Sequence, residues 1–247
     1  EAQSFWNDEG NSARLSERSI PAIIEGTASD IHPPLYYLAL RGWRELLGET
    51  EFGLRSLSAF AGVLVVAVVV AIGRRTTDHR RQTTDDDSQV TSALRGLSSV
   101  ARGPSAAIAG LLAALSPVLV YYSQETRMYA LLALLAALSA WVLLVWLGGV
   151  RRPLLWMIAY TLLLAAGLYT HYFFPAVVVA QGAVVVWREW GKGRGGERER
   201  GGGGSGGVLL NSYLVSRISY LGLWVGMAAV AALLYLSWVP VFLRQIG

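Results

Sequence analysis

The polar residues best suited to chemistry gather in a few short stretches of the sequence. The first is a pair of adjacent acids, Asp8 and Glu9. The second is the run Asp-Ile-His-Pro-Pro-Leu at 30–35, and the third is Tyr-Tyr-Ser-Gln-Glu-Thr-Arg at 121–127. A smaller group, Tyr-Thr-His-Tyr, occupies 169–172. These stretches supply carboxylates and histidines, which can move protons, and an arginine, which can hold an anion.

Transfer of a glycosyl group to a hydroxyl is one reaction that such residues could support, because it needs a base to take the hydroxyl proton. A phosphate leaving group needs no proton, so one carboxylate suffices, and an arginine can hold the phosphate through two hydrogen bonds. Asp8 and Glu9 are the candidate acids, and Arg14, Arg55 and Arg127 are the candidate phosphate ligands. An acidic pair is also favoured at the start of any helix by the helix dipole, without a function.

The remaining polar residues allow two interpretations each. His32 follows Asp30 closely and precedes two prolines, which fix an extended entry and start a helix. His32 and Asp30 are weak candidate ligands for a divalent metal ion, and the sequence, which has no Cys, indicates no other cofactor. The loop at 124–127 is either a polar connector with a surface ion pair or part of a binding site.

Apolar segments must position these polar stretches. Of the 247 residues, 53% are hydrophobic and 15% are charged, against about 25% charged in a soluble domain. A bilayer-spanning helix needs roughly 20 apolar residues. Segments of this kind lie at 54–73, 104–122, 128–147, 153–170, 173–190 and 218–240. The sequence therefore predicts an all-α integral membrane protein, multi-pass, with about six transmembrane helices.

The basic residues predict the orientation of these helices. Fourteen of the 21 basic residues lie in the connections after the first, third and fifth apolar segments. Basic loops stay in the cytoplasm, so the acids and the loop at 121–127 are expected on the extracytoplasmic side, in the cell membrane. The net charge of +4 is thereby explained by topology, and no nucleic acid is expected as a partner.

The chain divides into four predicted parts. Residues 1–53 are expected to form an external acidic loop with juxtamembrane helices, because the segment 33–48 is short for a span and carries Arg41, Arg44 and Glu45. A five-span core (54–190), a cytoplasmic Gly-rich linker (191–217) and a sixth transmembrane helix (218–247) follow. Ser116-Pro117 is expected to kink its span. The chain begins without Met and ends just after an apolar run, so we expect it to be a fragment.

The order of these motifs resembles a known family. Asp8-Glu9, then His-Pro-Pro-Leu-Tyr-Tyr at 32–37, then Glu-Phe-Gly-Leu-Arg at 51–55 is similar to the family 39 glycosyltransferases. These are membrane enzymes related to protein O-mannosyltransferases and to aminoarabinose transferases that act on lipid A. The stretches 116–129 and 169–173 are similar to the prokaryotic members. Together the matches touch most of residues 5–175.

The resemblance implies a C-type glycosyltransferase that takes its sugar from a polyprenyl-phosphate donor within the membrane lipid and inverts the anomeric carbon. It implies that Asp8 is the catalytic residue. We expect Glu9 to position the acceptor or to adjust Asp8, and Arg55 and Arg127 to hold the lipid phosphate. The other expected substrate-binding residues are His32, Tyr122, Gln124, Glu125 and His171. The acceptor is a hydroxyl on a protein, a lipid or a glycan.

Two other classes of protein stay open on the sequence. A transporter would need ionisable residues or broken helices near the middle of the membrane. Such residues are nearly missing from the apolar segments, while the polar clusters gather at one face. A non-catalytic membrane subunit or paralogue is the second alternative, and the sequence excludes it less well.

Overall fold

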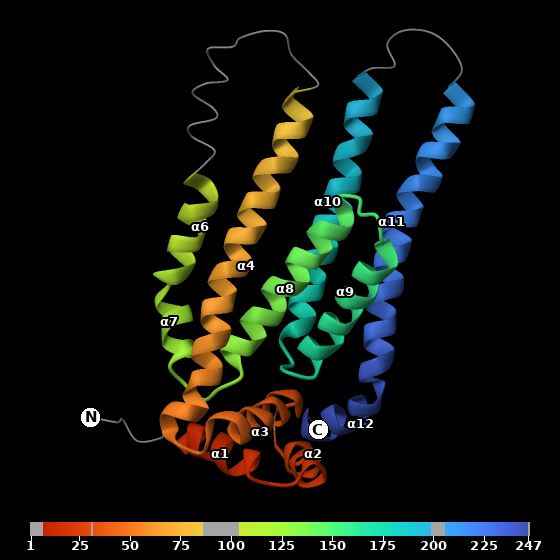
Figure 1. Cartoon of the computed structure of the whole chain (residues 1–247). Coiled ribbons are helices and arrows are strands. Elements are labelled where there is room, and N and C mark those ends of the chain that lie inside the picture. Colours follow the sequence, from red (N-terminus) through yellow and green to blue (C-terminus); the bar gives the residue numbers. More distant parts are fainter. Residues whose placement is uncertain (1–6, 31, 86–103, 199–205, 247) are drawn as a thin grey trace.

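The computed structural model describes residues 7–30, 32–85, 104–198 and 206–246. Every regular element among these residues is a helix, as predicted. The elements are α1 (Asn7–Ser16), α2 (Ile20–Ala28), α3 (Leu35–Leu47), α4 (Glu51–Asp85), α6 (Pro104–Ala114), α7 (Pro117–Ser123), α8 (Tyr129–Leu147), α9 (Pro153–Leu168), α10 (Phe174–Arg198), α11 (Gly206–Tyr235), the 3₁₀ turn η2 (Leu236–Trp238) and α12 (Val239–Ile246). The long helices run side by side as a bundle, with α1, α2, α3 and α12 across one end (Figure 1).

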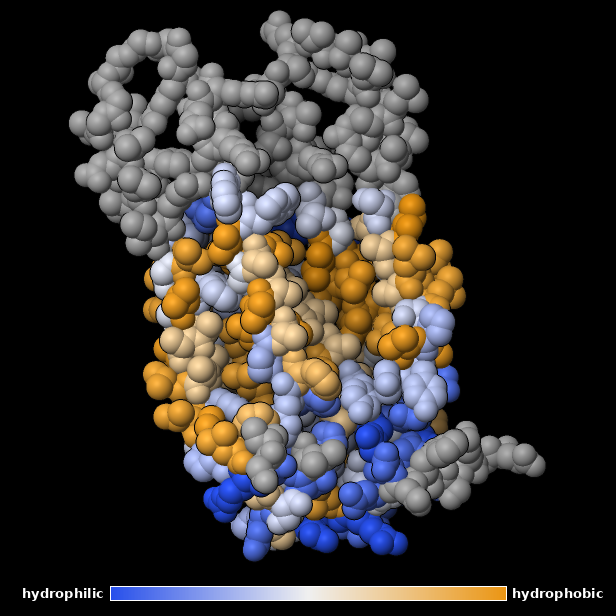
Figure 2. Space-filling model, turned by 180° about the vertical axis from the view of Figure 1, so that it is seen from behind, coloured by the Kyte–Doolittle hydropathy of each residue, from blue (hydrophilic) through white to orange (hydrophobic). Residues whose placement is uncertain are grey.

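Three stretches of helix are long and apolar enough to cross a membrane: Glu51–Thr76, Tyr129–Leu147 and Tyr220–Gln245. The bent pair α6 and α7 gives a fourth if it counts as one span, and α9 is apolar but shorter. On the face seen in Figure 2, a broad hydrophobic belt covers the bundle, and hydrophilic side chains gather at the end that carries α1–α3. The described residues thus contain three to four candidate spans. All six predicted segments are helical, but the count of six spans stays a prediction.

The break between α6 and α7 has a local cause. Pro117 at the start of α7 has no N–H to continue a helix, and the side chain of Ser116 caps α7 by accepting from the backbone N–H of Leu119 at 3.4 Å. The two helices meet at 53°. The kink expected from Ser116-Pro117 is therefore present, and it turns α7 toward the loop that leads to α8.

The predicted helix over 33–48 is present as α3, and it lies across the end of the bundle (Figure 1). Tyr36, Tyr37 and Leu40 are its buried face, packed with residues of α1, α2 and α4. Trp43 donates its indole N–H to the hydroxyl of Ser56 at 2.9 Å. These contacts fix α3, and with it α1, on the first turns of α4.

The other half of the bundle is held by a core and a buried polar network. Large apolar side chains from α8, α9, α10 and α11 form one cluster. Inside it, Tyr160 donates to the side-chain oxygen of Gln181 at 2.8 Å, and Gln181 donates to Ser139 at 2.8 Å. Trp224 donates to the Tyr160 hydroxyl at 2.9 Å. The network joins all four helices without a charge, which is how polar groups are tolerated between helices in a membrane.

Helices α10 and α11 both extend into the tract predicted as a Gly-rich linker, to Arg198 and from Gly206. Residues 199–205 lie outside the described part of the chain. The boundaries at 191 and 217 therefore stay predictions, as do the membrane sides of the four predicted parts.

Candidate functional site

The acidic pair occupies the first turn of α1, and its two carboxylates point to different partners. Glu9 is only 2% exposed. Arg55 donates to both oxygens of Glu9, from Nε at 3.0 Å and from Nη2 at 2.7 Å. The backbone N–H of Thr126 donates to the same carboxylate at 2.8 Å. Glu9 therefore ties α1 to the first turns of α4 and to the loop between α7 and α8.

Asp8 is 74% exposed and pairs with the loop instead. Its Oδ2 lies 3.0 Å from Nη1 of Arg127. The guanidinium of Arg127 also lies over the ring of Tyr129, 5.6 Å from the ring centre, and the hydroxyl of Ser58 donates to the Arg127 carbonyl at 3.3 Å. The Asp8 carboxylate is thus open to solvent on one side and faces a well-held cation on the other.

A chain of rings lies beside this ion pair. The centres of His32 and His171 are 5.7 Å apart, and those of His171 and Tyr129 are also 5.7 Å apart. Tyr129 contacts Tyr122 at 4.4 Å between centres. Nδ1 of His171 accepts the backbone N–H of Phe173 at 3.1 Å, so in the neutral ring the proton is on Nε2. The rings bring residues from three separate stretches of sequence to one place.

Both imidazoles are kept neutral by their surroundings. Burial lowers the pKa of His32; the nearby Asp30 carboxylate, 4.0 Å from Nδ1, acts in the opposite direction, and the charge of Arg127 lowers this pKa again. Burial also lowers the pKa of His171, and His32 and Arg127 lower it further. A histidine with a lowered pKa is uncharged near pH 7, and a neutral ring has one donor and one acceptor nitrogen. In His171 the acceptor is taken by Phe173, so Nε2–H is the group left to donate.

A cavity of about 390 Å³ lies between the first turns of α4 and the α7–α8 loop. Glu9 and Arg55 form part of its wall, and Gln124 and Glu125 line it from the loop. The other lining residues are Phe52, Ser56, Ala59, Tyr121 and Ser123. Its volume falls in the range of small-molecule sites, which is about 300–1,000 Å³. A polar ring-shaped ligand could occupy it beside the Glu9–Arg55 pair.

The nine predicted site residues therefore form two neighbouring groups. Direct contacts join the first group, which consists of Asp8, His32, Tyr122, Arg127 and His171 through Tyr129. The second group lines the cavity and consists of Glu9, Arg55, Gln124 and Glu125. Glu9 sits next to Asp8 in α1, and Thr126 sits next to Arg127 in the loop, so the two groups share a border.

The metal-ligand prediction for Asp30 and His32 rests on two residues. In the described part of the chain, no three His, Asp or Glu side chains are grouped as a metal ion would require. Asp30 and His32 approach each other at 4.0 Å. The metal role of Asp30 and His32 therefore stays a prediction.

Sequence reasoning missed three residues of the site. Tyr129 lies between Arg127 and His171, and the sequence placed it in the stretch 116–129 that resembles the family without giving it a role. Tyr37 is buried nearby, and burial raises the pKa of its hydroxyl, which therefore stays protonated. Thr126 contributes its backbone N–H, which no side-chain pattern could indicate.

An all-helical bundle with candidate spans, an apolar belt and an ion-paired site at one end defines a helical membrane protein. Residues 38–193, well over half of the chain, match the family model described as the protein O-mannosyl-transferase TMEM260 N-terminal domain. The chain belongs to this family. The family is one of mannosyltransferases, in agreement with the expected glycosyl transfer. No curated protein and no solved structure matches the chain.

The match divides the site residues. Arg55, Tyr122, His171 and the loop residues 124–127 lie within the matched range, whereas Asp8, Glu9 and His32 precede it. The family relationship thus covers the arginines and the cavity wall from α4 and the loop. The acids on α1 join the site through the contacts of Arg55, Arg127 and Thr126.

Proposed function

We propose that the protein transfers a hexose, mannose by the description of its family, from a polyprenyl-phosphate donor to a hydroxyl of an acceptor protein. The transfer takes place at the non-cytoplasmic face of the cell membrane and inverts the anomeric carbon, as in the C-type enzymes of family 39. Three findings support this proposal: the family match, the candidate spans, and a site that combines acids and arginines at one end of the bundle.

The observation that carries the proposal is the ion pair of Asp8 and Arg127 at the open edge of the site. It holds a base and a phosphate ligand at one place, and the sugar of the donor has to separate them, because in-line displacement puts the acceptor and the phosphate on opposite faces of the anomeric carbon. An exposed ion pair contributes only about 0–1 kcal/mol to stability, so stability alone is a weak reason for it. When the donor binds, its phosphate takes the place of Asp8 as the partner of Arg127, and the freed carboxylate faces the acceptor.

In the proposed step, the acceptor hydroxyl gives its proton to Asp8 while its oxygen attacks the anomeric carbon. The bond from that carbon to the phosphate oxygen breaks on the opposite face, and the bonding electrons leave with the polyprenyl phosphate. The guanidinium of Arg127 stabilises the negative charge that this phosphate gains. A single displacement from the opposite face gives inversion.

Glu9 has a positioning role in this account. Both of its oxygens accept hydrogen bonds from Arg55 or Thr126 and it is buried, so it is poorly placed to take a proton. Its bonds hold α1 against α4 and the loop, which sets the direction of Asp8 next to it. Arg55 acts chiefly through its two hydrogen bonds to Glu9. Because Arg55 is occupied in this way, Arg127 is the main phosphate ligand.

The cavity beside Glu9 is the proposed site for the sugar. Gln124 and Glu125 in its wall can donate to and accept from sugar hydroxyls. Tyr122, Tyr129 and the neutral histidines offer ring faces and uncharged hydrogen-bonding groups next to the reacting centre. The lipid tail of the donor would lie along the apolar belt outside the bundle, so the donor stays in the bilayer throughout.

The proposal is tested by incubating membranes that contain the chain with polyprenyl-phosphate mannose labelled in the sugar and with a Ser/Thr-containing peptide. We expect label on the peptide hydroxyls, with the anomeric configuration opposite to that of the donor. A non-catalytic subunit would retain the labelled donor and release no labelled peptide. Retention of configuration in the product would contradict a single displacement.

A further inference from the structure

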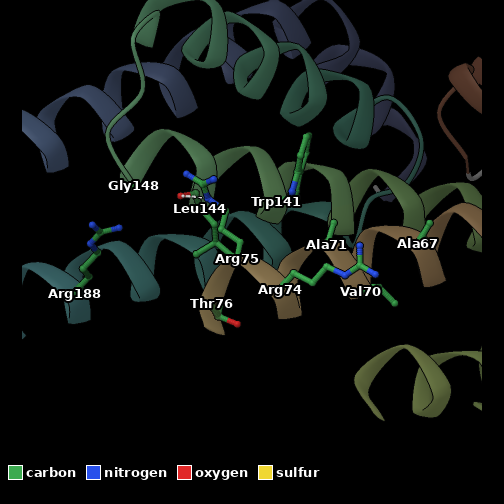
Figure 3. A pocket seen from close by; sticks show the side chains of 10 residues that line it. All are labelled: Ala67, Val70, Ala71, Arg74, Arg75, Thr76, Trp141, Leu144, Gly148 and Arg188. Carbon is green, nitrogen blue, oxygen red and sulfur yellow. Dashed lines mark hydrogen bonds between the residues drawn. The ribbon is translucent and has the colours of Figure 1, made fainter. Parts of the chain in front are cut away.

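A second cavity, of about 630 Å³, lies at the end of the bundle away from Asp8, between α4, α8 and α10. Arg55 and Arg75 are both on α4, and twenty residues of helix span about 30 Å, so this cavity is separate from the site described above. Its lining residues are Ala67, Val70, Ala71, Arg74, Arg75, Thr76, Trp141, Leu144, Gly148 and Arg188 (Figure 3). The cavity thus has an apolar part and a basic part.

Two of its arginines are fixed by the end of α8. Arg75 donates to the carbonyls of Leu144 at 3.3 Å and Val145 at 3.1 Å, and Arg188 donates to that of Leu147 at 2.7 Å. The last carbonyls of a helix have no partner within the helix and carry its negative dipole end, so these bonds are favourable. Figure 3 shows both side chains reaching this end of α8, from α4 and from α10. The bonds hold two cations at the cavity without neutralising them.

Gly148 allows this arrangement. A Cβ atom at Gly148 would lie 2.5 Å from Nη2 of Arg75, so a larger residue here would make the guanidinium shift from its present place at the end of α8. Arg74, on the same turn of α4 as Arg75, is exposed and runs along the helix beside Val70 (Figure 3). Among the described residues that line the cavity, none is acidic.

The apolar part of the cavity lies nearer the middle of the bundle than Arg74 and Arg75, because its α4 residues precede them by up to two helical turns. Ala67, Val70 and Ala71 belong to the candidate span of α4, and Leu144 belongs to that of α8. A ligand that fills the whole cavity must therefore carry an anionic group next to a hydrocarbon chain. A free phosphate would satisfy the arginines and leave the apolar wall uncovered.

We propose that this cavity binds an anionic phospholipid, with its phosphate among Arg74, Arg75 and Arg188 and one acyl chain along α4. Basic pockets between membrane helices are suited to anionic headgroups because each arginine near the headgroup adds attraction. Nη1 of Arg75 and the N–H groups of Arg74 can each donate to a phosphate oxygen. This site lies at the opposite end of the bundle from the proposed donor site, and no residue in its lining is suited to act as a base.

The test measures lipid retained by the full chain in native mass spectrometry from mixed micelles of phosphatidylglycerol and phosphatidylcholine. We expect the wild-type chain to retain phosphatidylglycerol preferentially. The Arg74→Gln variant removes a cation that holds no helix end, and it should weaken retention of phosphatidylglycerol about fivefold. Ala67→Trp fills the apolar wall without changing the charge, and it should weaken retention as well.

The matched control is the pair Arg151→Gln and Arg152→Gln, which removes two exposed cations between α8 and α9 that do not line the cavity. This variant should retain phosphatidylglycerol as the wild type does. Equal retention of the two lipids by the wild type, or an equal loss in the control, would overturn the proposal. Displacement of the lipid by inorganic phosphate alone would assign the cavity to free phosphate and overturn it too.

Discussion

Asp8 and Glu9 are neighbours in sequence, yet one faces solvent and the other is buried. Successive residues of a helix point about 100° apart, so a helix that lies across the end of a bundle turns one of two adjacent residues inward. Glu9 takes the inward position and meets Arg55 and the backbone of Thr126. Asp8 takes the outward position opposite Arg127. The same dipeptide thus provides an anchor and an accessible carboxylate.

Loss of the anchor should cost stability. Glu9→Gln removes the negative charge that pairs with Arg55, and the new NH2 group cannot accept a hydrogen bond where a carboxylate oxygen did. We therefore expect a loss of about 1.5–3 kcal/mol in the free energy of unfolding. Unfolding of the purified protein by denaturant in detergent measures this free energy. Glu17→Gln, at an exposed acid just after α1, should change the free energy by less than about 0.5 kcal/mol. Equal stability of the two variants would show that Glu9 holds nothing in place.

The histidines predict a dependence of stability on pH. The pKa values of His32 and His171 are lowered in the folded protein, from 6.5 in the unfolded chain. Their contribution to stability is therefore fully present above about pH 6.5, declines below it, and is lost once the pH has fallen through the folded-state values. Between about pH 7.5 and about pH 5.5, Tm should fall more in the wild type than in a His32→Gln/His171→Gln variant. A parallel fall in both proteins would assign the effect to other groups.

At the scale of elements, the loop between α7 and α8 supplies residues to both groups of the site. The break at Ser116-Pro117 directs α7, and the loop then places Arg127 opposite α1 and Gln124 on the cavity. Helix α3 packs against α1 and α4 and fixes the other side. The site is therefore built from short elements at the end of the bundle, while the long helices hold that end together.

The contribution of the polar network between the long helices to the free energy of unfolding should be measurable. Gln181→Leu keeps the size of the side chain but removes its bonds to Tyr160 and Ser139, and we expect a loss of about 0.6–2 kcal/mol. Unfolding in mixed micelles of detergent and sodium dodecyl sulfate reports this. The control on the same helix is Val179→Leu at an exposed apolar position, which should be close to neutral. A stable Gln181→Leu variant would mean that packing alone holds α8, α9 and α10.

Part of this structure could be predicted from the sequence. Apolar segments of helical length, the Ser116-Pro117 kink and the short loop at 124–127 all follow from local patterns, because each depends on residues within one turn or one span. The partners of Glu9 and Asp8 could not be predicted. Arg55 is 46 positions from Glu9 and Thr126 is 117 positions away, and only the packing of α1 decides which carboxylate meets which cation. The sequence predicted only a cytoplasmic position for Arg74, Arg75 and Arg188, since no local pattern shows that they line one cavity.

At the scale of the whole molecule, the two ends of the bundle differ in character. One end carries the acids, histidines and α1–α3, and the other carries the arginine-lined cavity. The hydrophobic belt lies between them (Figure 2). The proposed orientation places the acids outside and the arginines of the second cavity inside, in line with the positive-inside rule.

Labelling of introduced cysteines tests this orientation, and the chain suits it because it has no Cys of its own. Ser29→Cys near α2 and Arg151→Cys between α8 and α9 are both at exposed positions. In sealed vesicles of known sidedness, an impermeant maleimide should label the two from opposite sides. Labelling of both cysteines from one side would refute the orientation.

The division of roles between Asp8 and Arg127 tests the central proposal most directly, through the transfer rate and the donor affinity of each variant. Asp8→Asn keeps the shape of the side chain but removes the base, so the transfer rate should fall about 10²–10⁴-fold while donor affinity stays near that of the wild type. Arg127→Ala should weaken donor binding about tenfold or more, because a charged hydrogen bond to phosphate is lost. Glu17→Gln should leave both quantities unchanged. Transfer by Asp8→Asn at the wild-type rate would contradict the assignment of Asp8 as the base.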